Sequence, residues 1–360
     1  MDATSGRWIR ALALVSLISA VGCADLGSGK RAFDKGDYAA ALKEFLPLAT
    51  RGDPIAQNYL GGMYAQGRGV AQDYKEAIKW YRMAAEQGYA RGQVNFGHMC
   101  EIGYGAPQDY QEALKWYRLA ADQGEPEAYF DLGFMYEVGQ GVPENEGEAV
   151  KWYRLAAEKG NPHAQFNLGD RYEHAQGVPQ DYPEAVKWYR SAAEQGYSDA
   201  QISAGDAYAQ GQGVPQDYQE ALKWYRLAAD QNEPEAQLRL GEMYEDGRGV
   251  QREYTEAVKW YGLAAQQGDS DAQLDLGEMY EFGKGVPRDY IQAYSLYDPA
   301  KLPPCPRRDE IVKLRNRVAR KMTTRQVADA IALTRQRNTT QIGNLERQVR
   351  EWSKEVPVVY

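Results

Sequence analysis

The chain has 360 residues, and its 42 Lys and Arg stand against 51 Asp and Glu, a formal net charge of −9. It contains 27 Tyr, 8 Trp and 36 Gly but only 7 Phe and 3 His, a bias that is typical of a repeated sequence unit. Its histidines and cysteines do not occur at the spacing of zinc ligands, and it contains no complete nucleophile or phosphate-loop motif. We therefore expect no metal, cofactor or catalytic site.

The first 22 residues have the pattern of a secretion signal. Arg7 and Arg10 precede an apolar run at 11–21 that is too short to span a bilayer and ends in small residues. Cys23, at the end of "AVGC", resembles the lipidated cysteine of bacterial lipoproteins, and Ala24 follows it where Asp favours inner-membrane retention. This resemblance implies an outer-membrane lipoprotein that faces the periplasm. The alternative is cleavage after Ala24, which produces a soluble periplasmic or secreted protein.

Residues 54–305 repeat a unit of 36 residues. Six tryptophans, from Trp80 to Trp260, and seven glycines, from Gly61 to Gly277, recur at this interval. A fixed period of this size is the signature of a solenoid. Residues 23–53 are predicted to form a linker and a degenerate capping unit. The seven units, called repeats one to seven below, begin near Pro54, Ala90, Pro126, Pro162, Ser198, Pro234 and Ser270.

Each unit is predicted to be two antiparallel helices joined by a glycine turn. Apolar and small residues follow helical spacing on both sides of segments such as "DGRGV", where Gly247 and Gly249 break the helix. Gly241 lies inside the first helix of its unit, where Gly costs about 1 kcal/mol relative to Ala, so close helix contact is expected there. Gly124 and Asn232 end equivalent second helices and are expected to adopt the left-handed conformation.

The full pattern, "A-x-x-x-L-G-x-x-Y-x-x-G-x-G-V…D-Y-x-x-A-x-x-W-Y-x-x-A-A-x-x-G", resembles the Sel1-like repeats, which are related to tetratricopeptide repeats. The resemblance implies an all-α, right-handed superhelical solenoid with a C-terminal helical cap. Cys100 replaces a tyrosine of the pattern and is expected to fill the core. Cys305 is expected to lie tens of ångströms from it, too far for a disulfide.

Residues 306–360 form a tail of opposite charge. The tail carries 13 Lys and Arg against 6 Asp and Glu, whereas residues 23–305 have a net charge of −17. Two helical runs are expected in the tail, the second capped by Thr323 or Thr324. These helices are expected to cover the last apolar face of the solenoid, although the basic tail could also fold back over an acidic groove.

Binding is expected on the first helices, which line the inner curve of such solenoids. The second, sixth, ninth and thirteenth residues of each unit share one helical face. An Asn at the sixth position resembles the ligand-holding Asn of peptide-binding tetratricopeptide domains. The face should be partly apolar in the early units, with Ile102, Phe134 and Val138, and strongly acidic in the late ones. The candidate partner-binding residues are Tyr59, Asn95, His98, Asp131, Phe134, Asn167, Asp170, Asp199, Asp206, Glu235, Arg239, Glu242, Asp271, Asp275 and Glu278.

These features favour a non-catalytic scaffold of the bacterial cell envelope that binds an extended or basic protein partner. A membrane attachment through Cys23 is expected, and a nucleic-acid partner is not. The first alternative is a glycan-binding module of an export or cell-wall system, which requires exposed Tyr and Trp. The second alternative, an enzyme, requires a cluster of perturbed acids that the sequence does not display.

Overall fold

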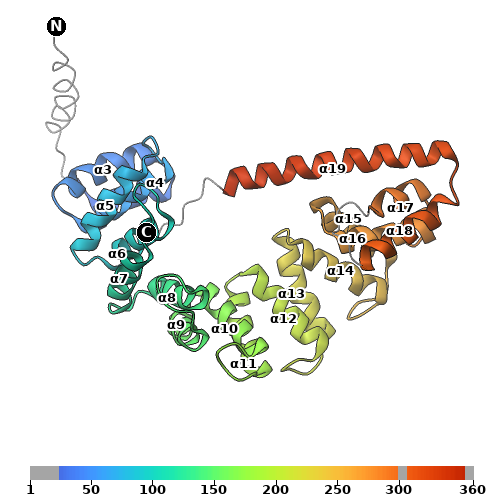
Figure 1. Cartoon of the computed structure of the whole chain (residues 1–360), viewed down its shortest axis with the longest axis horizontal. Coiled ribbons are helices and arrows are strands. Elements are labelled where there is room, and N and C mark those ends of the chain that lie inside the picture. Colours follow the sequence, from blue (N-terminus) through green and yellow to red (C-terminus); the bar gives the residue numbers. More distant parts are fainter. Residues whose placement is uncertain (1–23, 299–305, 353–360) are drawn as a thin grey trace, which may run out of the picture. The chain divides into compact units, whose positions relative to one another are not determined.

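The computed structural model describes residues 24–298 and 306–352, and every regular element in this part of the chain is an α-helix (Figure 1). Cys23, Cys305 and the predicted signal peptide lie outside the described residues. The helices are α2 (Leu26–Asp34), α3 (Tyr38–Thr50), α4 (Pro54–Gln66), α5 (Tyr74–Glu86), α6 (Ala90–Ile102), α7 (Tyr110–Ala121), α8 (Pro126–Val138), α9 (Glu146–Glu158), α10 (Pro162–His174), α11 (Tyr182–Glu194), α12 (Ser198–Gln210), α13 (Tyr218–Asp230), α14 (Pro234–Asp246), α15 (Tyr254–Gln267), α16 (Ser270–Phe282), α17 (Tyr290–Leu296), α18 (Pro306–Ala319) and α19 (Thr324–Trp352).

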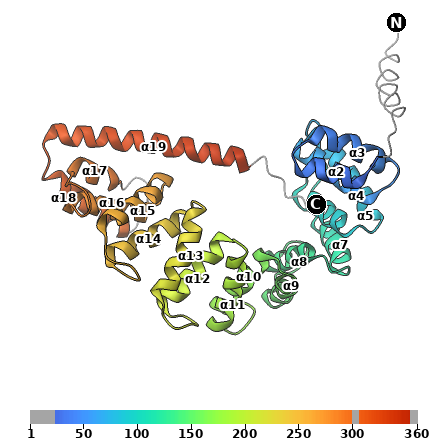
Figure 2. The ribbon, with the colours of Figure 1, turned by 180° about the vertical axis from the view of Figure 1, so that it is seen from behind.

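The chain forms two compact units that divide within α8. The first unit extends to Met135 and includes residues 140–142, and the second contains residues 136–139 and the chain from Pro143 onward. Consecutive helices pack as pairs in both units, α4 with α5 and α6 with α7 in the first, α10 with α11 and α12 with α13 in the second (Figures 1 and 2). Each pair is one repeat, so the predicted all-α repeat solenoid is confirmed.

Capping residues set the ends of both helices in a repeat. Asp109 precedes α7, and its carboxylate accepts hydrogen bonds from the backbone N–H groups of Gln111 and Glu112. At the turn after the first helix of repeat six, Gly247 and Gly249 have φ angles of 76° and 66°. This left-handed conformation ends α14 and directs the chain into α15, as the sequence predicted.

Residues 109–125 and 217–233 differ only in that Gly124 is replaced by Asn232, and this difference follows from backbone conformation. Gly124 has a φ of 84° near the end of repeat two, and Asn232 has a φ of 70° at the equivalent place near the end of repeat five. Asn is the residue that best tolerates this region after Gly, because its short polar side chain bonds locally. The prediction of a left-handed helix end is confirmed at both residues.

In six of the seven repeats, the glycine inside the first helix lies against a tyrosine ring of the following helical segment. A Cβ atom at Gly241 would stand 2.4 Å from two ring carbons of Tyr261, which is 1% exposed. Equivalent contacts pair Gly97 with Tyr117, at 2.5 Å, and recur in other repeats. The predicted close contact of the two helices is therefore confirmed in these six repeats, and the partner of the glycine is a buried tyrosine ring.

A shorter helix pair, α2 and α3, covers the first repeat. Gly29 of α2 faces the ring of Phe45 in α3, in the manner of the glycine and tyrosine of a repeat. Phe45 in turn stacks on Tyr59 of α4, with ring centroids 4.7 Å apart. The N-terminal helices thus imitate a repeat and bury the apolar face of α4.

The last repeat is covered by α18 and α19, which follow it in the sequence (Figure 2). Ile311 and Val318 of α18 join the core formed by Ala293 of α17 and by Tyr297, the residue that follows α17. Thr323 caps α19 by accepting a hydrogen bond from the backbone N–H of Gln326. Although α19 has 29 residues, no described helix combines the length and apolar character needed to cross a membrane.

Cys100 lies in the core, as its place in the repeat predicted. It is 6% exposed and a free thiol, and burial raises its pKa to about 11. The thiol therefore stays protonated at neutral pH and acts as a small apolar side chain.

Candidate partner-binding surface

A buried tyrosine of the second helix reaches a carboxylate of the first helix in six of the repeats. The Tyr117 hydroxyl donates to Glu101 Oε2 at 2.6 Å. Burial raises the pKa of Tyr117 well above its ordinary value, which keeps the hydroxyl a donor at neutral pH. Tyr225 instead donates to Asp206, since Ala209 occupies the glutamate position of repeat five. The other pairs are Tyr153 with Glu137, Tyr189 with Glu173, Tyr261 with Glu245 and Tyr297 with Glu281.

Cations from the next repeat neutralise several of these glutamates. The Arg171 guanidinium of α10 lies 2.5 Å from Glu137 Oε1, and 11% of the arginine side chain is exposed. In the same way Lys284, in the turn after α16, lies 2.8 Å from Glu245 Oε1. The tyrosine, the glutamate and the cation therefore link consecutive repeats by charge-assisted hydrogen bonds.

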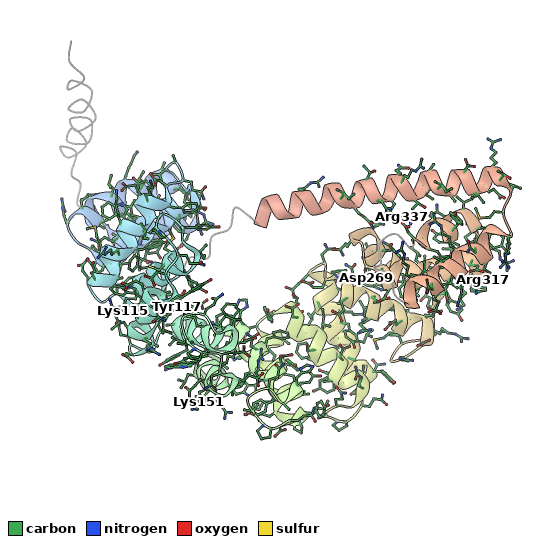
Figure 3. The ribbon with its side chains drawn as sticks, in the orientation of Figure 1. Lys115, Tyr117, Lys151, Asp269, Arg317 and Arg337 are labelled. Atoms are coloured by element: carbon green, nitrogen blue, oxygen red, sulfur yellow. The ribbon has the colours of Figure 1, made fainter. Side chains whose placement is uncertain are left out.

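The C-terminal cap supplies the cations for the last repeat. Arg317 and Lys321 of α18 lie 2.7 and 3.1 Å from the two oxygens of Glu281, whose side chain is fully buried. Burial opposes ionisation of Glu281, but the hydrogen bonds from Arg317 and Lys321 outweigh it and lower the pKa of this carboxyl. Arg337 of α19 donates to the backbone oxygen of Ser295 and to its hydroxyl (Figure 3). The described part of the basic tail thus binds the last repeat.

Several of the predicted binding residues of the early repeats are buried between helices. Tyr59, Asn95 and Asp131 are 8%, 1% and 8% exposed. Asn95 donates from Nδ2 to Asn58 Oδ1 at 2.8 Å, a contact between the first helices of repeats one and two. This asparagine is therefore engaged inside the solenoid and presents no surface to a ligand. Phe134, in contrast, is 38% exposed.

His98 and Asp131 form an ion pair between repeats two and three. His98 Nε2 lies 2.9 Å from Asp131 Oδ2, and the two side chains are 12% and 10% exposed. Burial disfavours the charged imidazole, but the Asp131 carboxylate outweighs burial and raises the pKa of His98 to about 9. At neutral pH the pair is charged, and it joins two repeats instead of facing solvent.

The acidic residues predicted in the late repeats gather around one arginine. Arg239 of α14 lies 3.4 Å from Asp206, 3.6 Å from Glu235 and 3.5 Å from Glu242. The side chains of Glu235 and Glu242 are 56% and 39% exposed. Three carboxylates share one cation, so this surface keeps an excess of negative charge. The acidic face is defined here as Asp199, Asp206, Glu235, Arg239, Glu242, Asp271, Asp275 and Glu278.

Asp275 is the most perturbed carboxyl of the acidic face. Burial, followed by the charges of Glu242, Glu245 and Glu278, raises its pKa to about 7. A cation that approached this carboxyl would favour its ionised form, so binding of a cation would release a proton near neutral pH.

The remaining members of the acidic face and the predicted residues of repeat four differ in their exposure. Asp199 is exposed, whereas Asp271, Glu278 and Asn167 are half-buried. Asp170 pairs within its own helix with His174, whose Nδ1 lies 3.0 Å from the carboxylate. The structure thus gathers Asp206, Glu235 and Glu242 around Arg239, and the role of the late candidates in binding stays a prediction.

The repeat tryptophans pack between repeats. Trp116 is 8% exposed and meets Phe96 edge to face at 5.3 Å, and Trp224 is 8% exposed in the core of repeats four and five. Trp80 and Trp260 are half-buried against the cores of the preceding helices. These side chains serve the packing of the solenoid and offer no exposed aromatic row for a sugar ring.

In the part of the chain that the structure describes, no three His, Cys, Asp or Glu side chains come together as ligands for a metal ion.

The Sel1 repeat pattern matches residues 54–89, 90–125, 126–161, 162–197, 198–233, 234–269 and 270–301. The chain belongs to the Sel1 repeat family. A solved Sel1 repeat protein from Oxalobacter formigenes is 37% identical over 67% of this chain and 99% of its own length, with a TM-score of 0.62. A protective antigen with the SLR fold from uropathogenic Escherichia coli is 31% identical over 90% of this chain and 84% of its own, with a TM-score of 0.40. No curated protein matches the sequence.

Proteins built of Sel1 repeats generally act as protein-interaction scaffolds, and the fold is typically non-catalytic.

Sequence reasoning missed the glutamates that accept from the buried tyrosines. Glu101, Glu137, Glu173, Glu245 and Glu281 follow the same period as the tryptophans, so their recurrence was visible in the sequence. Their cations were not, because each comes from a different position of the following repeat or from α18.

Proposed function

We propose that this Sel1 repeat protein is a scaffold of the bacterial cell envelope whose acidic face binds an extended, basic segment of a partner protein. The observation that carries the proposal is the excess of carboxylates around Arg239, with Glu235 and Glu242 partly exposed to solvent. Aligned charges on a repeat surface add their fields and attract a segment of opposite charge. Because exposed charges are screened beyond about 8 Å at physiological ionic strength, binding should weaken as salt is added.

Photo-crosslinking in cells tests the proposed surface. A photoreactive amino acid replaces Glu235 on the acidic face or, as the control, Lys223, whose side chain is 69% exposed on α13. The expected result is a discrete protein adduct from position 235 and none from 223. Equal adducts from both positions, or none from 235, would contradict the assignment of partner binding to the acidic face. Crosslinks from 235 to residues 306–360 alone would assign the face to the chain's own tail.

Attachment to the envelope rests on the lipobox-like sequence that ends at Cys23. In a bacterial host, the wild-type chain should incorporate an alkyne-labelled fatty acid and sediment with the outer membrane. The Cys23→Ser variant should lose the label and move to the soluble periplasmic fraction. An unlabelled wild-type chain in the soluble fraction would instead favour cleavage after Ala24.

A further inference from the structure

Among the described residues, two repeat glutamates, Glu101 and Glu173, lack the cation that Glu137, Glu245 and Glu281 have, and Glu173 is the one of the two that lines the cavity described below. Glu173 of α10 accepts a hydrogen bond from the Tyr189 hydroxyl at 2.6 Å, as the other repeat glutamates do from their tyrosines. Within residues 24–298 and 306–352 no Lys, Arg or His forms an ion pair with it. Glu137, Glu245 and Glu281 all have such a cation.

The missing cation is explained by two residues of repeat five. Arg171, which neutralises Glu137, occupies the tenth position of its repeat, and the tenth position of repeat five is Ala207. Lys284, which neutralises Glu245, occupies the fifteenth position, and the fifteenth position of repeat five is Gln212. Both places from which a cation reaches the preceding glutamate are therefore neutral in repeat five.

A cavity of about 160 Å³ lies beside Glu173. Its lining includes Glu173, Ala207 and Gln212, the three residues that the comparison of repeats singles out. Asp206 and Ser203 of α12 add polar atoms, and Tyr182, Val186 and Tyr189 of α11 add an apolar wall. At about 30 Å³ per molecule the cavity has room for roughly five waters. It combines carboxylates for a charged head with apolar surface for an aliphatic stem.

We infer that this cavity is a specificity pocket for the arginine side chain of a partner, which supplies to Glu173 the cation that Arg171 supplies to Glu137 inside the chain. A planar guanidinium has five donors, enough for Glu173, Asp206 and Gln212 together. The inference rests on the proposed scaffold function and adds that an arginine of the partner is its anchoring residue. The pocket adjoins the acidic face, since Asp206 belongs to both the pocket and the face.

A small probe tests the chemistry of the pocket without knowledge of the partner. The full chain is titrated with N-acetyl-arginine amide, and the NMR signals of the Ala207 methyl group are followed. We expect saturable shifts with half-saturation on the order of 1 mM, since a single anchoring side chain supplies only a few kcal/mol of binding free energy. The isosteric but neutral N-acetyl-citrulline amide should produce no saturable shift. Equal responses to both probes, or no response to the arginine probe, would overturn the inference.

Three variants locate the effect in the pocket. Glu173→Gln removes the charge but keeps an acceptor for Tyr189. It should lower the affinity for the arginine probe about tenfold or more, because a charge-assisted hydrogen bond is lost. Ala207→Arg should abolish probe binding, because it places a cation where Arg171 stands in the preceding repeat. Glu245→Gln is the matched control in a repeat that has its own cation, and probe affinity should stay unchanged. Unaltered affinity in Glu173→Gln would refute the assignment.

A second crosslinking experiment in cells separates failure of this inference from failure of the scaffold proposal. The photoreactive amino acid replaces Gln210, an exposed residue of the pocket lining. If the pocket anchors the partner, the adduct from 210 disappears in the Glu173→Gln background. An adduct that persists in that background refutes the pocket and leaves the scaffold proposal in place. Absence of adducts from both 210 and 235 in the wild-type chain refutes the scaffold proposal, whatever the probe does.

Discussion

Replacing Gly241 with alanine tests the contact between the glycine of the first helix and the tyrosine ring of the second helix in repeat six. Two opposing effects act on the free energy of unfolding. Alanine in a helix interior is favoured over glycine by about 1 kcal/mol. The new Cβ, however, would stand 2.4 Å from the Tyr261 ring, whereas ordinary carbon contacts lie at about 3.5–4.0 Å. The ring or the helix must therefore move by about 1 Å or more.

Tyr261 has little freedom to yield, because it is 1% exposed and its hydroxyl is held by Glu245 at 3.0 Å. Overpacking of a core costs about 1–3 kcal/mol, and displacement of the hydroxyl would add roughly 1 kcal/mol for the lost hydrogen bond. The packing cost exceeds the gain in helix propensity. We expect Gly241→Ala to destabilise the protein by about 1–3 kcal/mol.

Gly262 of α15 is the matched control in the same repeat. A Cβ there meets nothing within 4 Å, so Gly262→Ala should stabilise the protein by about 0.5–1 kcal/mol. Urea unfolding followed by Trp fluorescence measures both variants, and native-state hydrogen exchange shows whether the loss is confined to α14 and α15. The exchange data are needed because repeat arrays do not always unfold in one step. Stabilisation by Gly241→Ala equal to that by Gly262→Ala would refute the reasoning.

Four further predictions concern charges and backbone conformation. The pKa of His98 is raised from 6.5 to about 9 in the folded protein, so protonated His98 should stabilise the protein fully below pH 6.5. This contribution of up to roughly 3 kcal/mol should be lost as the pH rises to 9 and above. In urea unfolding, the midpoint of His98→Gln should lack this decrease with pH. The raised pKa of Asp275 should likewise weaken folding as pH rises from 3.8 to about 7, so Asp275→Asn should raise the melting temperature at pH 8 but not at pH 4. Asn232→Ala should cost about 1 kcal/mol in thermal unfolding, whereas Asn232→Gly should stay within about 0.5 kcal/mol. Glu281→Gln should destabilise the C-terminal cap by roughly 2 kcal/mol and speed hydrogen exchange in α18, and unchanged exchange there would contradict the role assigned to this carboxylate.

The helix pairs and their turns could be predicted from the sequence because the residues that shape them act locally. Gly247 and Asn232 end helices through their own φ angles, and Asp109 begins a helix through hydrogen bonds to the residues that follow it. Gly241 is a partial case. Because glycine destabilises a helix interior, its presence there predicted a close contact between helices, but only the structure identified the Tyr261 ring as the partner.

The partner-binding face could be predicted only in outline. Helical periodicity placed Asn95, Asp131 and Glu235 on one side of the first helices, but it did not distinguish the surface between neighbouring helices from the surface that faces solvent. The structure buries Asn95 and Asp131 in contacts between repeats and leaves Glu235 exposed.

Sequence alone therefore determined the repeat, its helices and its turns, since these depend on residues close together in the chain. Only the tertiary structure decided which charges are neutralised and where a cavity remains. The cations of Glu137, Glu245 and Glu281 lie 34 to 40 residues away, from Arg171 for Glu137 to Lys321 for Glu281, and no single spacing describes them all. Packing between repeats decides whether a side chain reaches across, and at Ala207 none does.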